Sequence, residues 1–499
     1  MNRKYTTVSS VLNVLGLIII INGIFILFPI IVSLIYKEYN MIKIFLVISS
    51  FSFIIGVFLR LVFKVDNIGN KESLLICGLA WIFVGIFAAL PFYFTTNVSF
   101  LDAYFETISG LTTTGITIYT HIGVMSKTVI FWRSLIQWIG GLGILTLFIA
   151  ITYVSNSSYF ILFSAESHKI DSPRPTPNIK KTVIILWGIY LGLTLIEVVV
   201  LKVLGVSLFD SINHTFTTLS TGGFSPYDSS INFYHQNAFK HFKLIEYTIT
   251  FFMFLGGMNF LLHYKFISGK IKEVIKNTEF KYYVFFIIGA VVLILINHYM
   301  KFPFTGESGT LLDDFESKFR SVLFTVVSIL TTTGYGTVDI NSSFFPQASR
   351  QILLVFMIFG GSVGSTGGGI KVIRIVVLYR MFKNQIRKLF FPKGAISEVV
   401  INNSIVPMVE IKRITGLFLG WLLLLLVGGV ITAFFTDLTA WQSFSGMFSA
   451  LGNIGPAFFS VKQMSLLPAV VKITYIIGML AGRLELLPII LLFNRRAWQ

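Results

Sequence analysis

Residues 108–120 read ISGLTTTGITIYT, in which a short apolar stretch leads into three threonines and a glycine, Gly115. Three later stretches repeat this order of residue types. They read FTTLSTGGFSPYD around Gly222, VSILTTTGYGTVD around Gly334 and FSALGNIGPAFFS around Gly455. The four glycines lie 107, 112 and 121 residues apart. This regularity predicts a fourfold internal repeat rather than chance turns between helices.

The composition around these tracts is that of a membrane protein. Of 499 residues, 55% are hydrophobic and 12% are charged, whereas about 25% are charged in ordinary soluble domains. This content excludes a soluble enzyme, a soluble nucleic-acid-binding protein and a disordered chain. The net charge of +17 fits the excess of Lys and Arg in the cytoplasmic loops of membrane proteins. We therefore expect contact with membrane lipid and no nucleic-acid partner.

Ten segments are long and apolar enough to cross a membrane, which takes about 20 mostly apolar residues. We expect an all-α polytopic membrane protein with ten transmembrane helices. An even number puts both termini on one side. The loops on that side hold most of the Lys and Arg residues, so both termini are expected in the cytoplasm. The expected spans lie at about 8–36, 44–63, 74–95, 135–154, 182–204, 246–264, 282–300, 351–381, 413–436 and 467–493.

The spans and the glycine tracts group into five segments. Two N-terminal helices occupy residues 1–70. Four pore repeats follow at 71–160, 180–266, 280–382 and 411–499. Each repeat has a long apolar span, a short apolar half-helix, a glycine tract and a second long span, and together they predict a pseudo-fourfold pore.

The short half-helices indicate which kind of binding site we expect. They are too short to span, so they must enter the membrane and return, and such backbone survives only inside protein or beside water. The C-terminal end of each half-helix carries partial negative charge toward the membrane centre. The tract behind it can turn backbone carbonyls toward an axis, because glycine tolerates positive φ. Four such tracts predict a ring of oxygens for a hard, weakly bound cation.

The sequence resembles the superfamily of K⁺ transporters that includes TrkH, KtrB and HKT, and most closely the TrkH family. The four-repeat plan carries the resemblance, and the two extra N-terminal spans also match TrkH. Four specific motifs agree with it: WRSLIQWIGGLGI at 132–144, GGSVGSTGGGIKVIR at 360–374, GNIGPAF at 452–458 and GRLELLP at 482–488.

The resemblance implies K⁺ uptake across the cytoplasmic membrane of a prokaryote, with K⁺ as the transported ion and no covalent cofactor. It also implies a homodimer and a cytosolic regulatory ring of TrkA type that binds nucleotide. Glycine rather than serine at Gly115 favours K⁺ over Na⁺ by comparison with HKT relatives. The fourth tract departs most from the pattern. The implied ion site is the backbone of Thr113, Thr114, Gly115, Ser220, Thr221, Gly222, Thr332, Thr333, Gly334, Asn453, Ile454 and Gly455.

The eighth span contains a candidate gate. The run GGSVGSTGGG disfavours helix, by about 1 kcal/mol per glycine relative to alanine, and it lies about midway through the membrane. We expect a flexible loop that blocks the path below the ring, with a glycine-rich packing kink as the alternative. A phosphate-binding loop is excluded, because Ile370 stands where that motif needs lysine. The gate glycines are Gly360, Gly361, Gly364, Gly367, Gly368 and Gly369.

Two charged residues inside spans add hypotheses. Arg483 is predicted either to project into the pore as an electrostatic barrier of the gate or to form a structural ion pair. A pair with Glu485 is disfavoured, because residues two apart face different sides of a helix. Glu197 is either a carboxylate for a coupling ion or a packing residue.

Competing functions follow from these observations. Symport of K⁺ with Na⁺ or H⁺ is the alternative to a gated pore, and Glu197 is its only sequence indication. A membrane enzyme is disfavoured because no catalytic set of residues converges on one site. The fourfold repeat also argues against a purely structural protein or a receptor.

Overall fold

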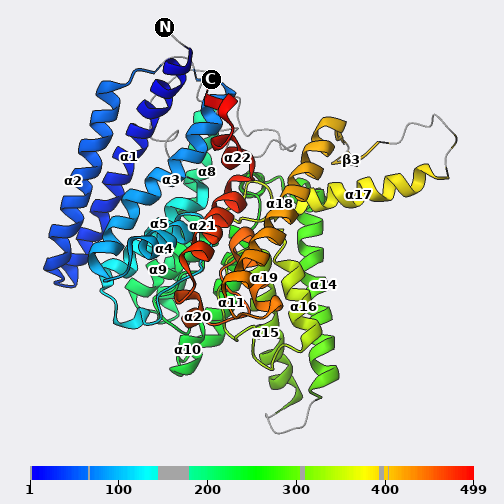
Figure 1. Cartoon of the computed structure of the whole chain (residues 1–499). Helices are drawn as coiled ribbons and strands as arrows, with labels where there is room; N and C mark the ends of the chain where they lie inside the picture. The colour runs from blue at the N-terminus through cyan, green and yellow to red at the C-terminus, as the bar shows by residue number, and fades with distance from the viewer. Residues whose placement is uncertain are drawn as a thin grey trace.

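The computed structural model describes residues 3–65, 68–143, 179–303, 310–390, 392, 398–402 and 404–498. The described chain is mainly helical, and both termini lie at the same end of the helix bundle (Figure 1). An N-terminal pair, α1 (Arg3–Ile35) and α2 (Tyr39–Val62), packs beside α3 (Asn70–Thr95).

The elements of the chain follow the expected order. The first repeat continues with α4 (Phe100–Leu111), η1 (Ile122–Val124) and α5 (Lys127–Leu142). The second contains α8 (Ile179–Val203), α9 (Leu208–Leu219), α10 (Asn232–Gln236), α11 (Phe242–Gly256) and α12 (Phe260–Ile267), and α13 (Ile271–Lys276) follows it. The third contains α14 (Thr278–Lys301), α15 (Leu311–Leu330), α16 (Gln347–Phe356), β1 (Phe359–Gly360), β2 (Ile370–Lys371) and α17 (Val372–Lys388). After the hairpin β3 (Val400–Ile401) and β4 (Ser404–Ile405) come α18 (Met408–Phe435), α19 (Ala440–Gly452), α20 (Val461–Ser465), α21 (Ala469–Leu484), α22 (Leu487–Leu492) and η2 (Arg495–Trp498).

Six helices of the described chain are long and apolar enough to cross a membrane: α1, α2, α3, α8, α14 and α18. They coincide with six of the ten expected spans. A seventh crossing is counted if the bent pair α11 and α12 is one span.

The second spans of the second and fourth repeats differ from expectation. Expected span 246–264 is broken between α11 and α12, which are bent by 101°. Expected span 467–493 is broken between α21 and α22 at Glu485 and Leu486, which both have positive φ. Span 351–381 is interrupted by the glycine-rich run, as the sequence predicts. In the first repeat α5 ends at Leu142, and residues 144–154 of the expected span lie outside the described residues.

Glycines of the second spans pack closely against the half-helices. An added Cβ on Gly140 would lie 1.9 Å from the carbonyl oxygen of Leu111, the last residue of α4. On Gly482 it would lie 2.1 Å from that of Leu451 in α19. The second span of a repeat therefore touches the backbone at the end of its own half-helix, which only glycine permits.

The four half-helices α4, α9, α15 and α19 begin in the same way. Each N-cap is a Ser or Thr whose hydroxyl accepts a hydrogen bond from the backbone N–H three residues later, which satisfies a free amide of the first turn. The caps are Ser99, Ser207, Thr310 and Thr439. Helix α15 has 20 residues and is longer than a half-helix. Its outer turns carry Asp313, Asp314, Glu316 and Lys318, and its nearly continuous buried run begins only at Arg320.

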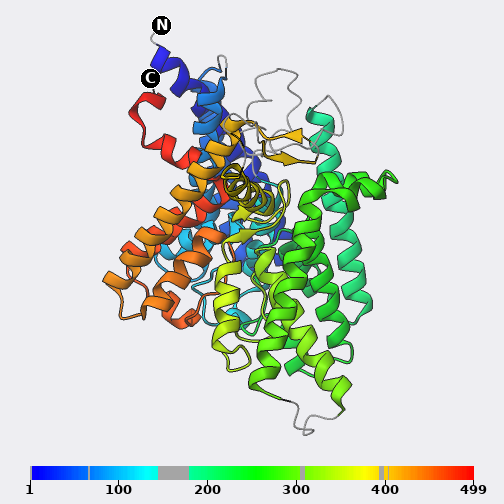
Figure 2. The ribbon, with the colours of Figure 1, turned by 90° about the vertical axis from the view of Figure 1, so that its right-hand side faces the viewer.

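The apolar core has two parts. One joins the N-terminal helices and the first repeat to α19 and α21 of the fourth repeat. The other joins the second and third repeats, whose helices run side by side in Figure 2. The four glycine tracts lie where these two parts meet.

Candidate functional site

The four glycine tracts share one backbone conformation. Each half-helix is followed by a residue in the left-handed region and, two residues later, by a glycine with positive φ. The left-handed residues are Thr113, Thr221, Thr332 and Asn453, with φ of 53°, 53°, 62° and 54°. The glycines are Gly115, Gly223, Gly334 and Gly455, with φ of 81°, 73°, 82° and 107°.

Hydrogen bonds confirm that the tracts are equivalent. The amide of the residue between the left-handed residue and the glycine folds back onto the half-helix in every case. These bonds run from Thr114 to Ser109, Gly222 to Thr217, Thr333 to Ser328 and Ile454 to Ser449, at 2.8, 2.9, 2.8 and 3.0 Å.

This geometry corrects the alignment of the second tract by one residue. Gly223, not Gly222, takes the place of Gly115, and Gly222 takes the place of Thr114. Ser220 is the C-cap of α9 with φ of −72° and lies outside the equivalent set. The second tract contains two adjacent glycines, and only the backbone angles separate the two alignments.

The tracts meet in a closed ring. Each glycine lies against the carbonyl of the next repeat, and the fourth lies against the first. A Cβ added to Gly115, Gly223, Gly334 or Gly455 would lie 2.2, 1.9, 1.8 or 3.0 Å from the carbonyl oxygens of Gly222, Thr333, Ile454 and Thr114, respectively. The arrangement therefore brings four backbone carbonyls to one place, as a carbonyl cation site requires.

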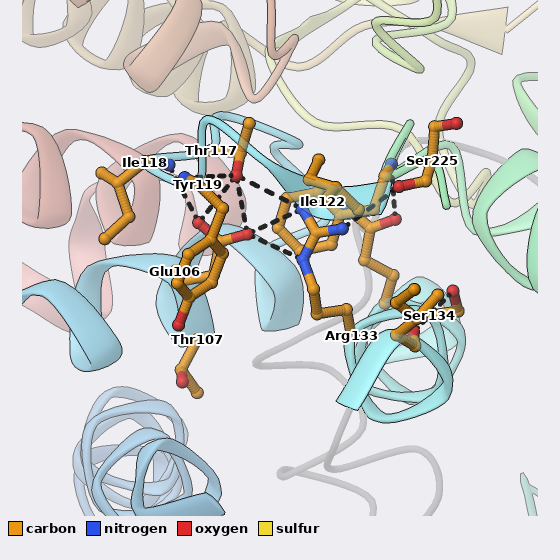
Figure 3. A network of polar contacts seen from close by, with 12 residues as sticks. Glu106, Thr107, Thr117, Ile118, Tyr119, Ile122, Arg133, Ser134 and Ser225 are labelled. Atoms are coloured by element: carbon orange, nitrogen blue, oxygen red, sulfur yellow. Dashed lines mark hydrogen bonds and ion pairs between the residues drawn. The ribbon is translucent and has the colours of Figure 1, made fainter. Parts of the chain in front are cut away.

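A buried ion pair lies behind the first tract (Figure 3). Arg133 of α5 donates from Nε and Nη2 to Oε1 of Glu106 in α4, at 2.9 and 2.8 Å. The other oxygen of Glu106 accepts from the amide of Ile118 at 3.0 Å. Arg133 also donates to the carbonyl oxygen of Ser225 in the second tract, at 3.2 Å. The pair thus ties the chain after the first ring glycine to the chain after the second.

Neither member of this pair was among the residues singled out from the sequence. The available signal was one acid and one base, each in an otherwise apolar segment, because such charges are buried only when paired. The two residues are 27 positions apart in the sequence. The spacing of three or four residues that pairs side chains on one helix therefore does not predict their contact.

Gln137 of α5 supports the second tract. Its Nε2 donates to the carbonyl oxygen of Gly222 at 2.6 Å, and its Oε1 accepts from the amide of Phe224 at 3.1 Å. A carbonyl oxygen has two lone pairs, so this contact leaves one acceptor position on Gly222.

Arg483 of the fourth repeat lies beside the ring and contacts the first and third repeats. The guanidinium donates to the carbonyl oxygens of Gly140 and Gly141, both at 2.5 Å, and to the hydroxyl of Thr113 at 3.2 Å. It also donates to the carbonyl oxygen of Thr366 in the glycine-rich run. Glu485, the partner considered for it, forms an ion pair with Arg374 of α17.

The glycine-rich loop, residues 361–369, lies directly beneath the second and third tracts. It connects β1 to β2, which pair in parallel. The hydroxyl of Thr366 donates to the carbonyl oxygens of Leu219 and Gly256, at 2.9 and 3.0 Å. The amide of Gly368 donates to the hydroxyl of Thr332 at 2.9 Å. The structure thus brings the predicted gate segment and Arg483 together against the left-handed residues of the ring.

Glu197 of α8 lies close to Thr218, near the end of α9. Its side chain is fully buried on α8. In the part of the chain that the structure describes, no hydrogen bond joins it to the four tracts or to the glycine-rich loop. The described residues also hold no group of three or more His, Cys, Asp or Glu side chains placed to bind a metal.

The long apolar helices of the mainly helical described chain define a multi-span membrane protein. The chain belongs to the TrkH family, described as cation transport proteins, whose family model matches residues 70–498.

Relatives and a solved structure agree. The chain is 30% identical to the Trk system potassium uptake protein TrkH of Halomonas elongata, over 98% of this chain and 99% of that protein. It is 30% identical to TrkH of Escherichia coli K12 over 86% of each chain. The crystal structure of the potassium transporter TrkH from Vibrio parahaemolyticus superposes with a TM-score of 0.84 at 28% identity and covers both chains completely.

Proposed function

We propose that this chain takes up K⁺ across the cytoplasmic membrane of a prokaryote through the ring of four tracts. The observation that carries the proposal is the closed contact of each ring glycine with the carbonyl of the next repeat. Backbone carbonyls in such a ring replace the hydration shell of a monovalent cation. The names of the relatives, which are potassium uptake proteins, support K⁺ as that cation.

The proposed ion site follows the corrected alignment. In each tract it comprises the left-handed residue, the residue after it and the ring glycine. The set is Thr113, Thr114, Gly115, Thr221, Gly222, Gly223, Thr332, Thr333, Gly334, Asn453, Ile454 and Gly455. The fourth tract completes the ring with Asn453, whose side-chain amide donates to the hydroxyl of Thr114 at 2.9 Å.

The gate in this proposal is the glycine-rich loop together with Arg483. Both lie beneath the ring, and they are joined by the hydrogen bond from Arg483 to Thr366. A guanidinium charge on the path repels an incoming cation, and the loop blocks the space below the ring. Opening requires that Thr366 and Gly368 of the loop leave their contacts with Leu219, Gly256 and Thr332.

The remaining organisation is proposed from the order of elements and from the family. The chain crosses the membrane ten times in an N-terminal segment 1–70 and four repeats, with broken second crossings and both termini in the cytoplasm. A homodimer docks a cytosolic TrkA-type ring that binds nucleotide. Helix α17, which projects from the bundle in Figure 1, carries the basic residues Arg380, Lys383, Arg387 and Lys388 for that partner or for acidic lipid.

Uptake of radioactive Rb⁺ into sealed vesicles tests the function. The vesicles hold the purified chain and internal KCl, and no other gradient is applied. Uptake that external K⁺ suppresses and external Na⁺ does not would support the K⁺-selective pore. Uptake that requires a Na⁺ or H⁺ gradient would replace the pore by symport and direct attention to Glu197. Flux that persists after Gly334→Ser, with its selectivity unchanged, would contradict the ring as the site.

A further inference from the structure

A buried lysine closes the glycine-rich loop on itself. Lys371 directly precedes α17 and is 5% exposed. Its Nζ donates to the carbonyl oxygen of Gly367 and, at 3.4 Å, to that of Gly368. Among the ion pairs of the described residues, none includes Lys371. The ammonium group is therefore held by backbone carbonyls rather than by a carboxylate.

This placement is costly unless the carbonyls act as cation ligands. A buried charge needs hydrogen-bonding partners of the right polarity, and an isolated ammonium would lose its hydration without compensation. Carbonyl oxygens offer the negative end of a dipole and two lone pairs each. An ammonium group and K⁺ are both monovalent cations of similar size, so oxygens that hold one can also hold the other.

The neighbouring carbonyl is engaged in the same way. The carbonyl oxygen of Thr366 accepts a hydrogen bond from the guanidinium of Arg483. Three consecutive carbonyls of one loop, those of Thr366, Gly367 and Gly368, thus face two side-chain cations. No carboxylate takes part in these contacts.

The carbonyls of Thr366, Gly367 and Gly368 lie beside the ring. The amide of Gly368 donates to the hydroxyl of Thr332, the left-handed residue of the third tract, at 2.9 Å. The hydroxyl of Thr366 lies 3.2 Å from that of Thr221, the left-handed residue of the second. An ion that leaves the ring toward the cytoplasm therefore meets this part of the loop next.

We propose that the carbonyls of Thr366, Gly367 and Gly368 form a second site for a monovalent cation, and that Lys371 occupies it while the loop is closed. The proposal rests on the proposed function, because the ion that takes the site is the one that passes the ring. Lys371 then acts as a tethered competitor of the transported ion. Its withdrawal both frees the oxygens and removes a positive charge from the path.

Anomalous scattering from Tl⁺, a heavy analogue of K⁺, tests the site in crystals of the full chain. The proteins are the unaltered chain, Lys371→Met, which removes the charge at similar length, and Lys371→Arg, which keeps it. We expect a Tl⁺ peak at the ring in all three and a second peak beside the carbonyls of Gly367 and Gly368 only in Lys371→Met. A Lys371→Met protein without the second peak would overturn the proposal, as would the same peak in the unaltered chain. A missing peak at the ring alone would instead overturn the ring assignment.

If Lys371→Met does not fold, a measurement of Tl⁺ flux with a second variant tests the proposal. Lys371→Gln removes the charge with a polar side chain, and Tl⁺ entry into vesicles is measured without any regulator. We expect entry to rise about tenfold, because a unit charge close to a permeating ion is removed. Lys371→Arg should leave entry low, as should Lys265→Met, which alters a surface ion pair on α12 with Glu273. Equal entry for Lys371→Gln and Lys371→Arg would contradict the competitor role.

Discussion

Gly115 is a residue at which a single added methyl group would disturb the ring. Its φ is 81°, and an added Cβ would lie 2.2 Å from the carbonyl oxygen of Gly222. The left-handed conformation costs other residues about 1–2 kcal/mol, and the clash adds a forced shift of the second tract.

We therefore expect Gly115→Ser to weaken discrimination of K⁺ from Na⁺ by about tenfold, because carbonyl positions set selectivity. Competition of K⁺ and Na⁺ against Rb⁺ uptake measures the ratio. Gly188→Ser is the matched control, since nothing lies within 4 Å of a Cβ at Gly188. An unchanged ratio in Gly115→Ser would remove Gly115 from the ion site.

The pair Arg133 and Glu106 gives a prediction on stability. The two side chains are 1% and 0% exposed, and removing one partner leaves an uncompensated buried charge. Arg133→Met should lower the free energy of unfolding by about 3–5 kcal/mol. Lys243→Met breaks the pair of Lys243 with Glu316, in which Lys243 is 49% exposed, and should cost at most about 1 kcal/mol. Thermal unfolding in detergent compares the two, and similar shifts would contradict the argument.

Sequence reasoning at this scale located the tracts but not their full geometry. The repeated order of threonines and glycine identified all four tracts. The backbone angles were needed to choose Gly223 over Gly222, because either glycine satisfies the same pattern of letters. Arg133 and Gln137 escaped notice because their roles depend on contacts with other segments of the chain.

At the scale of single elements, hydrogen bonds hold the glycine-rich loop beside the ring. The Thr366 hydroxyl donates to two carbonyl oxygens, those of Leu219 and Gly256. Thr366→Val keeps the shape and removes both hydrogen bonds, so a buried carbonyl loses a partner, at about 1–3 kcal/mol.

We expect Thr366→Val to raise Rb⁺ flux several-fold without a regulator, since the closed position of the loop is destabilised. Thr366→Ser, which keeps the hydroxyl, should behave like the unaltered chain. A silent pore in Thr366→Val would show that these bonds hold the loop open rather than closed.

The broken second spans show where mean hydropathy fails to predict the end of a helix. Glycine and methionine are apolar enough to keep the average high across the sequence GGMN at 256–259. The chain nevertheless bends by 101° there, and Asn259 caps the next helix through the amide of Leu261 at 2.8 Å. A helix stop at glycine followed by an N-cap was the available signal. The cause itself is tertiary, because Gly256 packs against the carbonyl of Leu219.

Across the described part of the molecule, Arg483 connects three of the four repeats. It belongs to the fourth repeat, donates to Gly140, Gly141 and Thr113 of the first, and donates to Thr366 of the third. Most of its partners are carbonyls of neighbouring chain segments rather than a carboxylate. These contacts brace neighbouring segments, and the barrier role of Arg483 stays a prediction.

We expect Arg483→Ala to raise Rb⁺ flux about tenfold in the absence of a regulator, because a positive charge leaves the path. Arg483→Lys keeps the charge and should stay closer to the unaltered chain. The amount of protein recovered from membranes serves as the second measurement. Loss of insertion in both variants would favour bracing alone.

At the same scale, the fold class and the order of the repeats follow from composition and spacing. The family model and the solved structure agree with a multi-span membrane protein of the TrkH family, and the order of the repeats stays a prediction. The meeting of four loops, each from a different repeat, does not follow from any local pattern. It arises because two apolar core clusters place the repeats around a common centre.

The contact between the fourth tract and the first has a consequence for biosynthesis. Asn453 and Thr114, which it joins, are 339 residues apart. A ribosome must therefore insert almost the whole chain before the ring can close. A partly translated chain holds three tracts at most, so the ring is completed only when the fourth tract has been made.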